Sequence, residues 1–83
     1  MAAVEPNWRK RINRDPGILR GTPVITGNRV PIEIILGSLA SGMSTTEVCE
    51  DYRLTESDIQ AALAYATELV ARQKRRPIPG RAK

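Results

Sequence analysis

Apolar residues recur every three or four positions through the second half of the chain, which is the period of an α-helix with one buried face. The longest regular pattern predicts a helix over residues 55–72. Its apolar positions are Ile59, Ala62, Leu63, Ala66, Leu69 and Val70. A second pattern follows Pro31, a residue suited to the first turn of a helix. Its apolar positions are Ile32, Ile35, Leu36 and Leu39.

Sequence signals indicate where these helices begin and end. Gly42 suits the end of the first helix, and Ser44 and Glu47 have the spacing of a capping box that opens a short helix over residues 44–52. A similar start, TESD at residues 55–58, opens the long helix. Only two or three residues separate these two helices, which is the connection expected of a helix-turn-helix.

The stretch GTPVITGNRVP in the first half has the composition of a tight turn between short strands. A phosphate-binding loop would need its glycines followed by a lysine and then a serine or threonine, and this stretch lacks that pair. We therefore expect a hairpin in which residues 24–26 form one arm, Gly27 and Asn28 form the turn, and residues 29–30 form the return arm.

These elements predict a mainly α protein with three helices and a small N-terminal β-hairpin, preceded by a short strand at residues 12–14. Residues expected in the core or at a dimer contact are Val24, Ile25, Ile59 and Leu63. The domain would span residues 11–72, between a flexible basic arm at residues 1–10 and a flexible basic tail at residues 73–83.

The composition limits the chemistry. With 83 residues the chain is one domain, and its single cysteine excludes an internal disulfide. Because the chain has no histidine, we expect no catalytic residue, no metal, no cofactor and no small-molecule substrate. Cys49 lies among acids that would raise its thiol pKa, so we expect a buried apolar side chain. No signal peptide or long apolar segment is found, which predicts a cytoplasmic protein without membrane contact.

Charge is sorted by position along the chain. Residues 1–30 carry six Lys and Arg against two acids, residues 31–71 carry one arginine against seven acids, and residues 72–83 carry six Lys and Arg and no acid. Basic ends therefore flank an acidic middle. The ends suit a polyanion or an acidic protein surface as partner.

The basic residues of the N-terminal half are predicted to bind nucleic acid. They are Arg9, Lys10, Arg11, Arg14, Arg20 and Arg29. A short arginine-rich β-element can lie along a DNA backbone, and a symmetric dimer doubles the number of contacts. The alternative is that these side chains only protect exposed strand edges. Trp8 is expected to be a surface ring covering the hairpin, with base stacking as the alternative.

The charge of the helix pair does not suit DNA. In a helix-turn-helix the first residues of the second helix meet base edges, yet here they include Glu56 and Asp58. The preceding helix adds Glu47, Glu50 and Asp51, which also repel phosphate. These three acids could bind a divalent cation weakly, but a solvated helix face is the better interpretation. We therefore expect a poor reader of the DNA groove.

Residues 15–66 resemble a small prokaryotic family. The residues that carry the resemblance are Gly21, Pro23, Gly27, Arg29, Pro31 and Gly42, followed by the capping box and an alanine-rich helix with a tyrosine. The family is catalogued as a domain of unknown function and is grouped with the VapB-like antitoxins, the partners of PIN-like toxins. Asn28 stands where threonine is common in that family, and Arg20 stands where glycine is frequent.

The resemblance implies a homeodomain-like or winged helix-turn-helix core that neutralises a PIN-like ribonuclease toxin and, as a homodimer, binds its own operator DNA. PIN-like nucleases hold Mg²⁺ with clustered carboxylates, which a basic segment can enter. The residues predicted to bind the toxin are Arg72, Lys74, Arg75, Arg76 and Ile78. A stand-alone DNA-binding transcriptional regulator is the main alternative, and an adaptor that pairs helices through the 59–70 face is a third.

Overall fold

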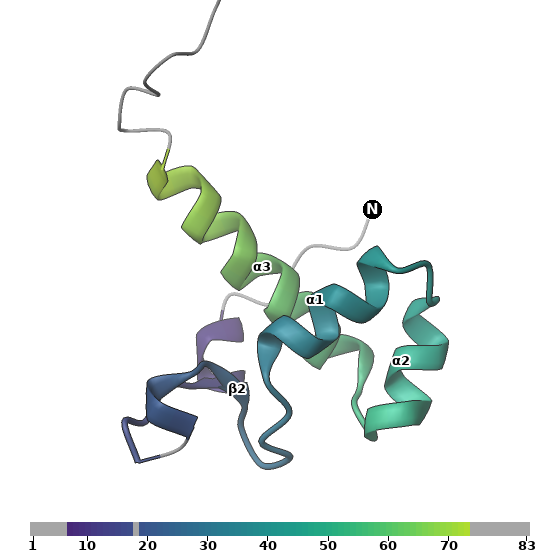
Figure 1. Ribbon diagram of the computed structural model, residues 1–83, viewed down its shortest axis with the longest axis horizontal. Coiled ribbons are helices and arrows are strands. Elements are labelled where there is room, and N and C mark those ends of the chain that lie inside the picture. Colours follow the sequence, from purple (N-terminus) through teal and green to yellow (C-terminus); the bar gives the residue numbers. More distant parts are fainter. Residues whose placement is uncertain (1–6, 18, 74–83) are drawn as a thin grey trace, which may run out of the picture.

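Three α-helices follow a short two-stranded hairpin in the computed structural model, which describes residues 7–17 and 19–73 (Figure 1). In chain order the elements are the 3-10 helix η1 (Trp8–Arg11), strand β1 (Ile12–Asn13), the 3-10 helix η2 (Leu19–Gly21), strand β2 (Val24–Ile25) and the α-helices α1 (Ile32–Ala40), α2 (Thr45–Tyr52) and α3 (Glu56–Gln73). The predicted mainly helical class with an N-terminal hairpin is confirmed. Each α-helix contacts the other two, so the helices enclose one core.

The hairpin pairs different segments from those that the turn pattern predicted. β1 runs antiparallel to β2, with Ile12 opposite Ile25. The expected return arm at residues 29–30 is wrong as a strand, because this side of β2 forms only an isolated bridge between Val24 and Pro31. The Ile25 N–H donates to the Val30 carbonyl and the Ile32 N–H donates to the Pro23 carbonyl, both at 2.9 Å, and the pairing goes no further because α1 begins at Ile32. The strand that pairs with β2 is therefore β1.

The turn after β2 is longer than the predicted two residues and spans residues 26–28. It is closed by the Arg29 N–H, which donates to the Ile25 carbonyl at 2.8 Å. The left-handed residues are Gly27, at φ 95°, and Arg29, at φ 60°, rather than Gly27 and Asn28. The turn therefore reverses the chain as predicted but with a different residue in the strained position.

Local signals set the helix ends as the sequence predicts. Gly42 follows α1 in the left-handed conformation, at φ 109°, and its N–H donates to the Leu39 carbonyl. The capping box of α2 is complete, since the Ser44 side chain accepts the Glu47 N–H and the Glu47 carboxylate accepts the Ser44 N–H. Both later helices begin and end within one residue of their predicted bounds.

The core lies between β2 and the three helices. The largest fully buried side chains are Ile25, Ile32, Ile35, Ile59, Val24 and Val48. The prediction that Val24, Ile25 and Ile59 belong to the core is therefore confirmed. These residues come from β2, α1, α2 and α3, so every element of the predicted domain contributes to a single apolar cluster.

The prediction that Leu63 belongs to the core is wrong for the single chain, in which this residue is 45% exposed. Ala61 is fully buried instead. α1 has 9 residues and α3 has 18, so a helix of about 14 Å covers only part of one of about 27 Å. The C-terminal half of α3 extends beyond the other elements (Figure 1), and Leu69 and Val70 are exposed with it.

η1 replaces part of the predicted flexible arm. Residues 1–6 of that arm lie outside the described residues, whereas Trp8 to Lys10 belong to η1, which packs against α3. Trp8 borders a groove on α3 together with Leu63 and Ala64, so its ring lies on α3 rather than over the hairpin. The Arg9 guanidinium lies 4.6 Å from the centre of the Trp8 ring.

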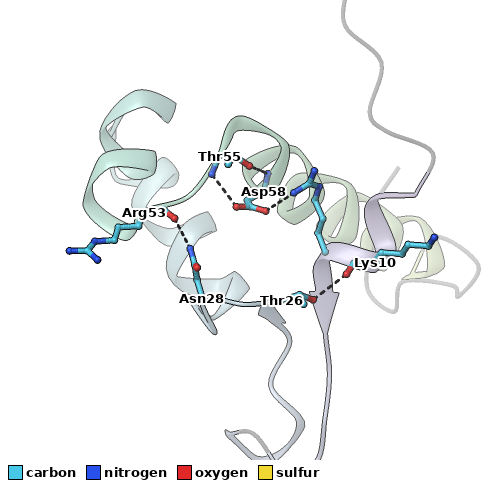
Figure 2. A network of polar contacts seen from close by, with 7 residues as sticks. Lys10, Thr26, Asn28, Arg53, Thr55 and Asp58 are labelled. Atoms are coloured by element: carbon cyan, nitrogen blue, oxygen red, sulfur yellow. Dashed lines mark hydrogen bonds and ion pairs between the residues drawn. The ribbon is translucent and has the colours of Figure 1, made fainter.

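Asp58 joins the hairpin to the helix pair (Figure 2). It is buried, with 8% exposure, and its carboxylate accepts the Thr55 N–H at 3.0 Å. The Thr55 hydroxyl accepts the Asp58 N–H in return, at 3.2 Å, so this pair caps α3 as the TESD pattern predicts. The second carboxylate oxygen accepts a hydrogen bond from Arg11 at 3.2 Å. One side chain therefore caps α3 and fixes the residue that precedes β1.

Two further contacts attach the hairpin turn to this joint (Figure 2). The Thr26 hydroxyl donates to the Lys10 carbonyl at 3.1 Å. The Asn28 side-chain amide donates to the Arg53 carbonyl at 2.5 Å. The turn is thereby tied to η1 on one side and to the connection between α2 and α3 on the other.

Asp58→Ala should lower the free energy of unfolding by about 2–3 kcal/mol, because it removes the cap of α3 and the carboxylate that holds Arg11. Urea unfolding followed by circular dichroism measures this change. The matched control is Asp51→Ala, an exposed acid on α2, which should change the free energy by less than about 0.5 kcal/mol. Equal effects of the two substitutions would contradict the role given to Asp58.

Candidate nucleic-acid and protein-binding surfaces

The six basic residues predicted to bind nucleic acid divide into two groups. Arg9 pairs with Glu68 of α3, and Arg11 pairs with the buried Asp58. Glu68 also pairs with Arg72, one helical turn further along, at 3.4 Å. These acids neutralise Arg9 and Arg11 and hold η1 on α3. Both arginines therefore serve the fold and are less suited to bind phosphate than the sequence predicted.

The second group consists of Lys10, Arg14, Arg20 and Arg29, termed here the hairpin basic surface. All four residues are exposed, and within the described residues none of them forms an ion pair. Arg20 lies in η2 with a left-handed backbone, at φ 58°. These cations keep their full charge for an external partner, because no acid of the described chain neutralises them.

The hairpin basic surface is divided between the two ends of the β-ribbon. Arg14 Nε donates at 3.1 Å to a backbone carbonyl of the loop that carries Arg20, so these two arginines share one end. The hydrogen bond to the Lys10 carbonyl holds that residue beside the turn that contains Arg29. Arg14 is four positions after Lys10 in the sequence, a distance of at most about 13 Å along the chain. One hairpin therefore offers cations at two separate points.

α2 and α3 have the connectivity of a helix-turn-helix and are joined by residues 53–55. Arg53 ends α2 in the left-handed conformation, at φ 57°. The first turn of α3 carries the exposed Glu56, and α2 presents the exposed Glu50 and Asp51. In a DNA groove the acidic end of α3 would face phosphate oxygens, which disfavours such a contact.

The acids of α2 do not form an evident cation site. Within residues 7–17 and 19–73, no group of three His, Cys, Asp or Glu side chains is placed to hold a metal ion. Glu47 is already engaged, since its carboxylate accepts the Ser44 N–H at 2.8 Å. A solvated helix face describes Glu47, Glu50 and Asp51 well, because all three are exposed.

From Leu63 to Val70, α3 presents apolar side chains that helical periodicity predicted for the core. The large exposed residues are Leu63, Leu69 and Val70. A groove on one side of the helix is lined by Leu63, Ala66, Thr67, Val70 and Ala71. No helix in the described part of the chain is long and apolar enough to cross a membrane. Periodicity alone could not identify this surface, since its exposure depends on which faces of α3 the other elements cover.

The residues predicted to bind a toxin begin where α3 ends. Arg72 is exposed in the last turn of that helix. Lys74, Arg75, Arg76 and Ile78 lie outside the described residues. Arg72 is therefore the member of this group that the structure describes.

A family model described as a protein of unknown function, DUF433, matches residues 12–66, from β1 to the middle of α3. The chain belongs to the DUF433 family. A relative, the uncharacterized protein y4eO of Sinorhizobium fredii (strain NBRC 101917 / NGR234), is 35% identical over 69 residues, which are 82% of this chain and 31% of the relative. The chain thus spans about a third of the length of that relative. No solved structure matches.

The DUF433 match includes most of the hairpin basic surface but not the end of α3. Its range includes Arg14, Arg20 and Arg29, so most of the hairpin basic surface lies within the family domain. It ends at Ala66, close to the point where α3 leaves the core, and Arg72 lies beyond it. The projecting end of α3 is therefore an extension of the matched DUF433 domain.

Cys49 of this DUF433 domain is half-buried rather than fully buried as expected. Burial raises its thiol pKa above the ordinary value, and the carboxylates of Glu56, Asp58 and Glu50 raise that pKa further. The predicted direction of the shift is confirmed. Glu56 and Asp58 were not among the acids that the sequence indicated, because they belong to α3 and reach Cys49 across the turn.

We expect Cys49 to react more slowly with a thiol reagent in the folded protein than in urea at about pH 8, because the thiolate is the reacting form. The neutral thiol contributes stability that is present below the unfolded pKa and is lost as pH rises through the raised folded pKa. Disulfide exchange with a chromogenic reagent measures the reaction rate over a pH series, and urea unfolding at the same pH values measures the free energy of unfolding. Equal rates in the folded and unfolded protein would contradict the shift.

Proposed function

We propose that this protein is the antitoxin of a type II toxin–antitoxin pair, which binds and neutralises a PIN-like ribonuclease toxin and binds its own operator DNA as a homodimer. The observation that carries the proposal is the end of α3, which leaves the core with exposed apolar residues and Arg72 and continues into a segment rich in Lys and Arg. The resemblance of residues 15–66 to VapB-like antitoxins supports the same function.

The basic segment suits the active site of a metal-dependent nuclease. PIN-like nucleases hold Mg²⁺ with clustered carboxylates, so their catalytic cleft is negatively charged. An arginine can form two parallel hydrogen bonds with one carboxylate. The residues proposed to supply charge are Arg72, Lys74, Arg75 and Arg76, and Ile78 between two prolines is proposed as an apolar anchor. Bound across the carboxylates, this segment would exclude RNA from the cleft.

The hairpin basic surface is proposed to bind the operator through its phosphates. Its cations lack acid partners in the described chain and stand at both ends of the ribbon, so one hairpin can meet the DNA backbone at two points. A homodimer doubles this number. Arg9 and Arg11 are proposed only to hold η1 on α3. Because Arg9 covers the Trp8 ring, base stacking by that ring is disfavoured.

A stand-alone DNA-binding transcriptional regulator is the second candidate, and the helix-turn-helix connectivity of α2 and α3 is the observation that favours it. A mobility-shift assay of the isolated protein on its own promoter at physiological salt separates the two candidates. Tight, sequence-specific binding without any toxin supports the regulator. We propose no enzymatic activity, because the chain has no histidine and its only thiol has a raised pKa.

Deletion of residues 73–83 should abolish inhibition of the toxin and leave the core folded, because it removes most of the charges proposed to enter the catalytic cleft. RNA cleavage by the PIN-like ribonuclease encoded beside the gene measures inhibition, and circular dichroism measures folding. Deletion of residues 80–83 is the matched control, since it removes Arg81 and Lys83 but keeps the proposed binding segment. Undiminished inhibition by the longer deletion would end the proposal.

Combined Arg14→Gln and Arg20→Gln substitutions should make operator binding less dependent on salt. Each lost phosphate contact reduces the slope of log K against log salt by about 0.9, so the double variant should lose about 1.8 per chain. Fluorescence anisotropy with labelled operator measures the slope. Arg53→Gln, in an exposed arginine of the α2–α3 connection, should leave the slope unchanged. An unchanged slope in the double variant would exclude a contact between DNA and the end of the hairpin that carries Arg14 and Arg20.

A further inference from the structure

One face of α3, from Leu63 to Val70, has the residue spacing of a helix-pairing surface. Leu63, Ala66, Thr67 and Val70, termed the α3 stripe, follow the steps of three and four that bring residues to the seam between paired helices. Leu63 is 45% exposed and Val70 is 55% exposed. All four line the same groove. The stripe thus has a large apolar side chain at each end and small residues at its centre.

The polar groups in and beside the stripe already have partners within the chain. The Thr67 hydroxyl donates to the Leu63 carbonyl at 2.8 Å. At the border of the stripe, Glu68 pairs with both Arg9 and Arg72. Covering the stripe would therefore leave none of these groups without a hydrogen-bond partner, which removes the main cost of burying a polar atom.

We propose that the α3 stripe is covered by the α3 stripe of a second copy of this chain, with the two helices antiparallel. A two-fold axis between Ala66 and Thr67 places Leu63 of each chain against Val70 of the other, so that both contacts form together. The small central residues let the two backbones approach closely. This inference rests on the homodimer of the proposed function and names the surface that forms it.

The charges along α3 favour the antiparallel direction. The first turn carries the exposed Glu56, and the last turn carries the exposed Arg72. The sequence continues with Lys74, Arg75 and Arg76. An antiparallel pair brings the acidic end of one helix beside the basic end of the other, whereas a parallel pair brings the basic ends together. A second copy also fits better than residues 74–83 of the same chain, which offer one large apolar residue, Ile78, to a stripe with two.

Sedimentation equilibrium of the full chain, without toxin or DNA, tests the pairing. The unmodified chain should form a reversible dimer, and Leu63→Glu and Val70→Lys should each weaken the dimer about tenfold or more, because each places a charge against an apolar residue. Ile34→Glu is the matched control, since Ile34 is another exposed apolar residue, on α1, and its substitution should leave the dimer unchanged. Circular dichroism verifies that each variant is folded.

An equimolar mixture of the Leu63→Glu and Val70→Lys variants tests the direction of the helices. In an antiparallel pair the new glutamate and lysine face one another and the second contact is unaltered, so the mixture should regain a dimer that neither variant forms alone. A parallel pair would gain nothing from mixing. Trp8, the only tryptophan, borders a groove with Leu63, so its emission should change with dimer formation.

A chain that remains monomeric at millimolar concentration overturns the pairing, and so does a dimer that both substitutions leave intact. In a monomeric chain, loss of toxin binding by the stripe variants would assign the stripe to the toxin. An effect of Val70→Lys on Trp8 emission only when residues 74–83 are present would assign it to that segment. Toxin inhibition is assayed separately, so the pairing can fail while the proposed antitoxin function stands.

Discussion

The contact between Asp58 and Arg11 holds the two halves of this small domain together. A hairpin with strands of two residues is not stable alone, and the long α3 needs a cap for its first turn. One carboxylate meets both needs, since it binds the Thr55 N–H and the Arg11 guanidinium. Asp58 is also the only buried charged residue in the described part of the chain. The placement of the hairpin basic surface therefore depends on it.

The elements that local chemistry specifies could be predicted from the sequence. Gly42, the Ser44 capping box and the TESD start of α3 act over a few residues, and each lies where the pattern indicated. The strand partner of β2 could not be predicted in this way, because the paired residues lie 11 and 13 positions apart in the sequence. The exposure of Leu63 was missed for a similar reason, since it depends on which elements pack on each face of α3: α1 borders the face of Tyr65 and Leu69, whereas Leu63 lies on the face beside Trp8.

The candidate site shows the same division. Counting cations identified the basic ends of the chain, and the acidic start of α3 was evident from its sequence. The count could not tell which arginines are neutralised, because the pairs Arg9–Glu68 and Arg11–Asp58 join residues 59 and 47 positions apart. Such long-range pairs reduce the six cations of the N-terminal half to four that no acid of the described chain neutralises. They also hold η1 beside the α3 stripe.

In the described part of the chain, the non-glycine residues with a left-handed backbone are all arginines, namely Arg20, Arg29 and Arg53. This conformation costs a residue with a side chain roughly 1 kcal/mol, a penalty that glycine escapes. At these positions, the arginine that supplies a positive charge also lowers the stability of the fold. A glycine at Arg20 or Arg29 would remove the backbone strain and, with it, one positive charge of the hairpin. A more stable version of this domain would therefore bind an anionic partner more weakly.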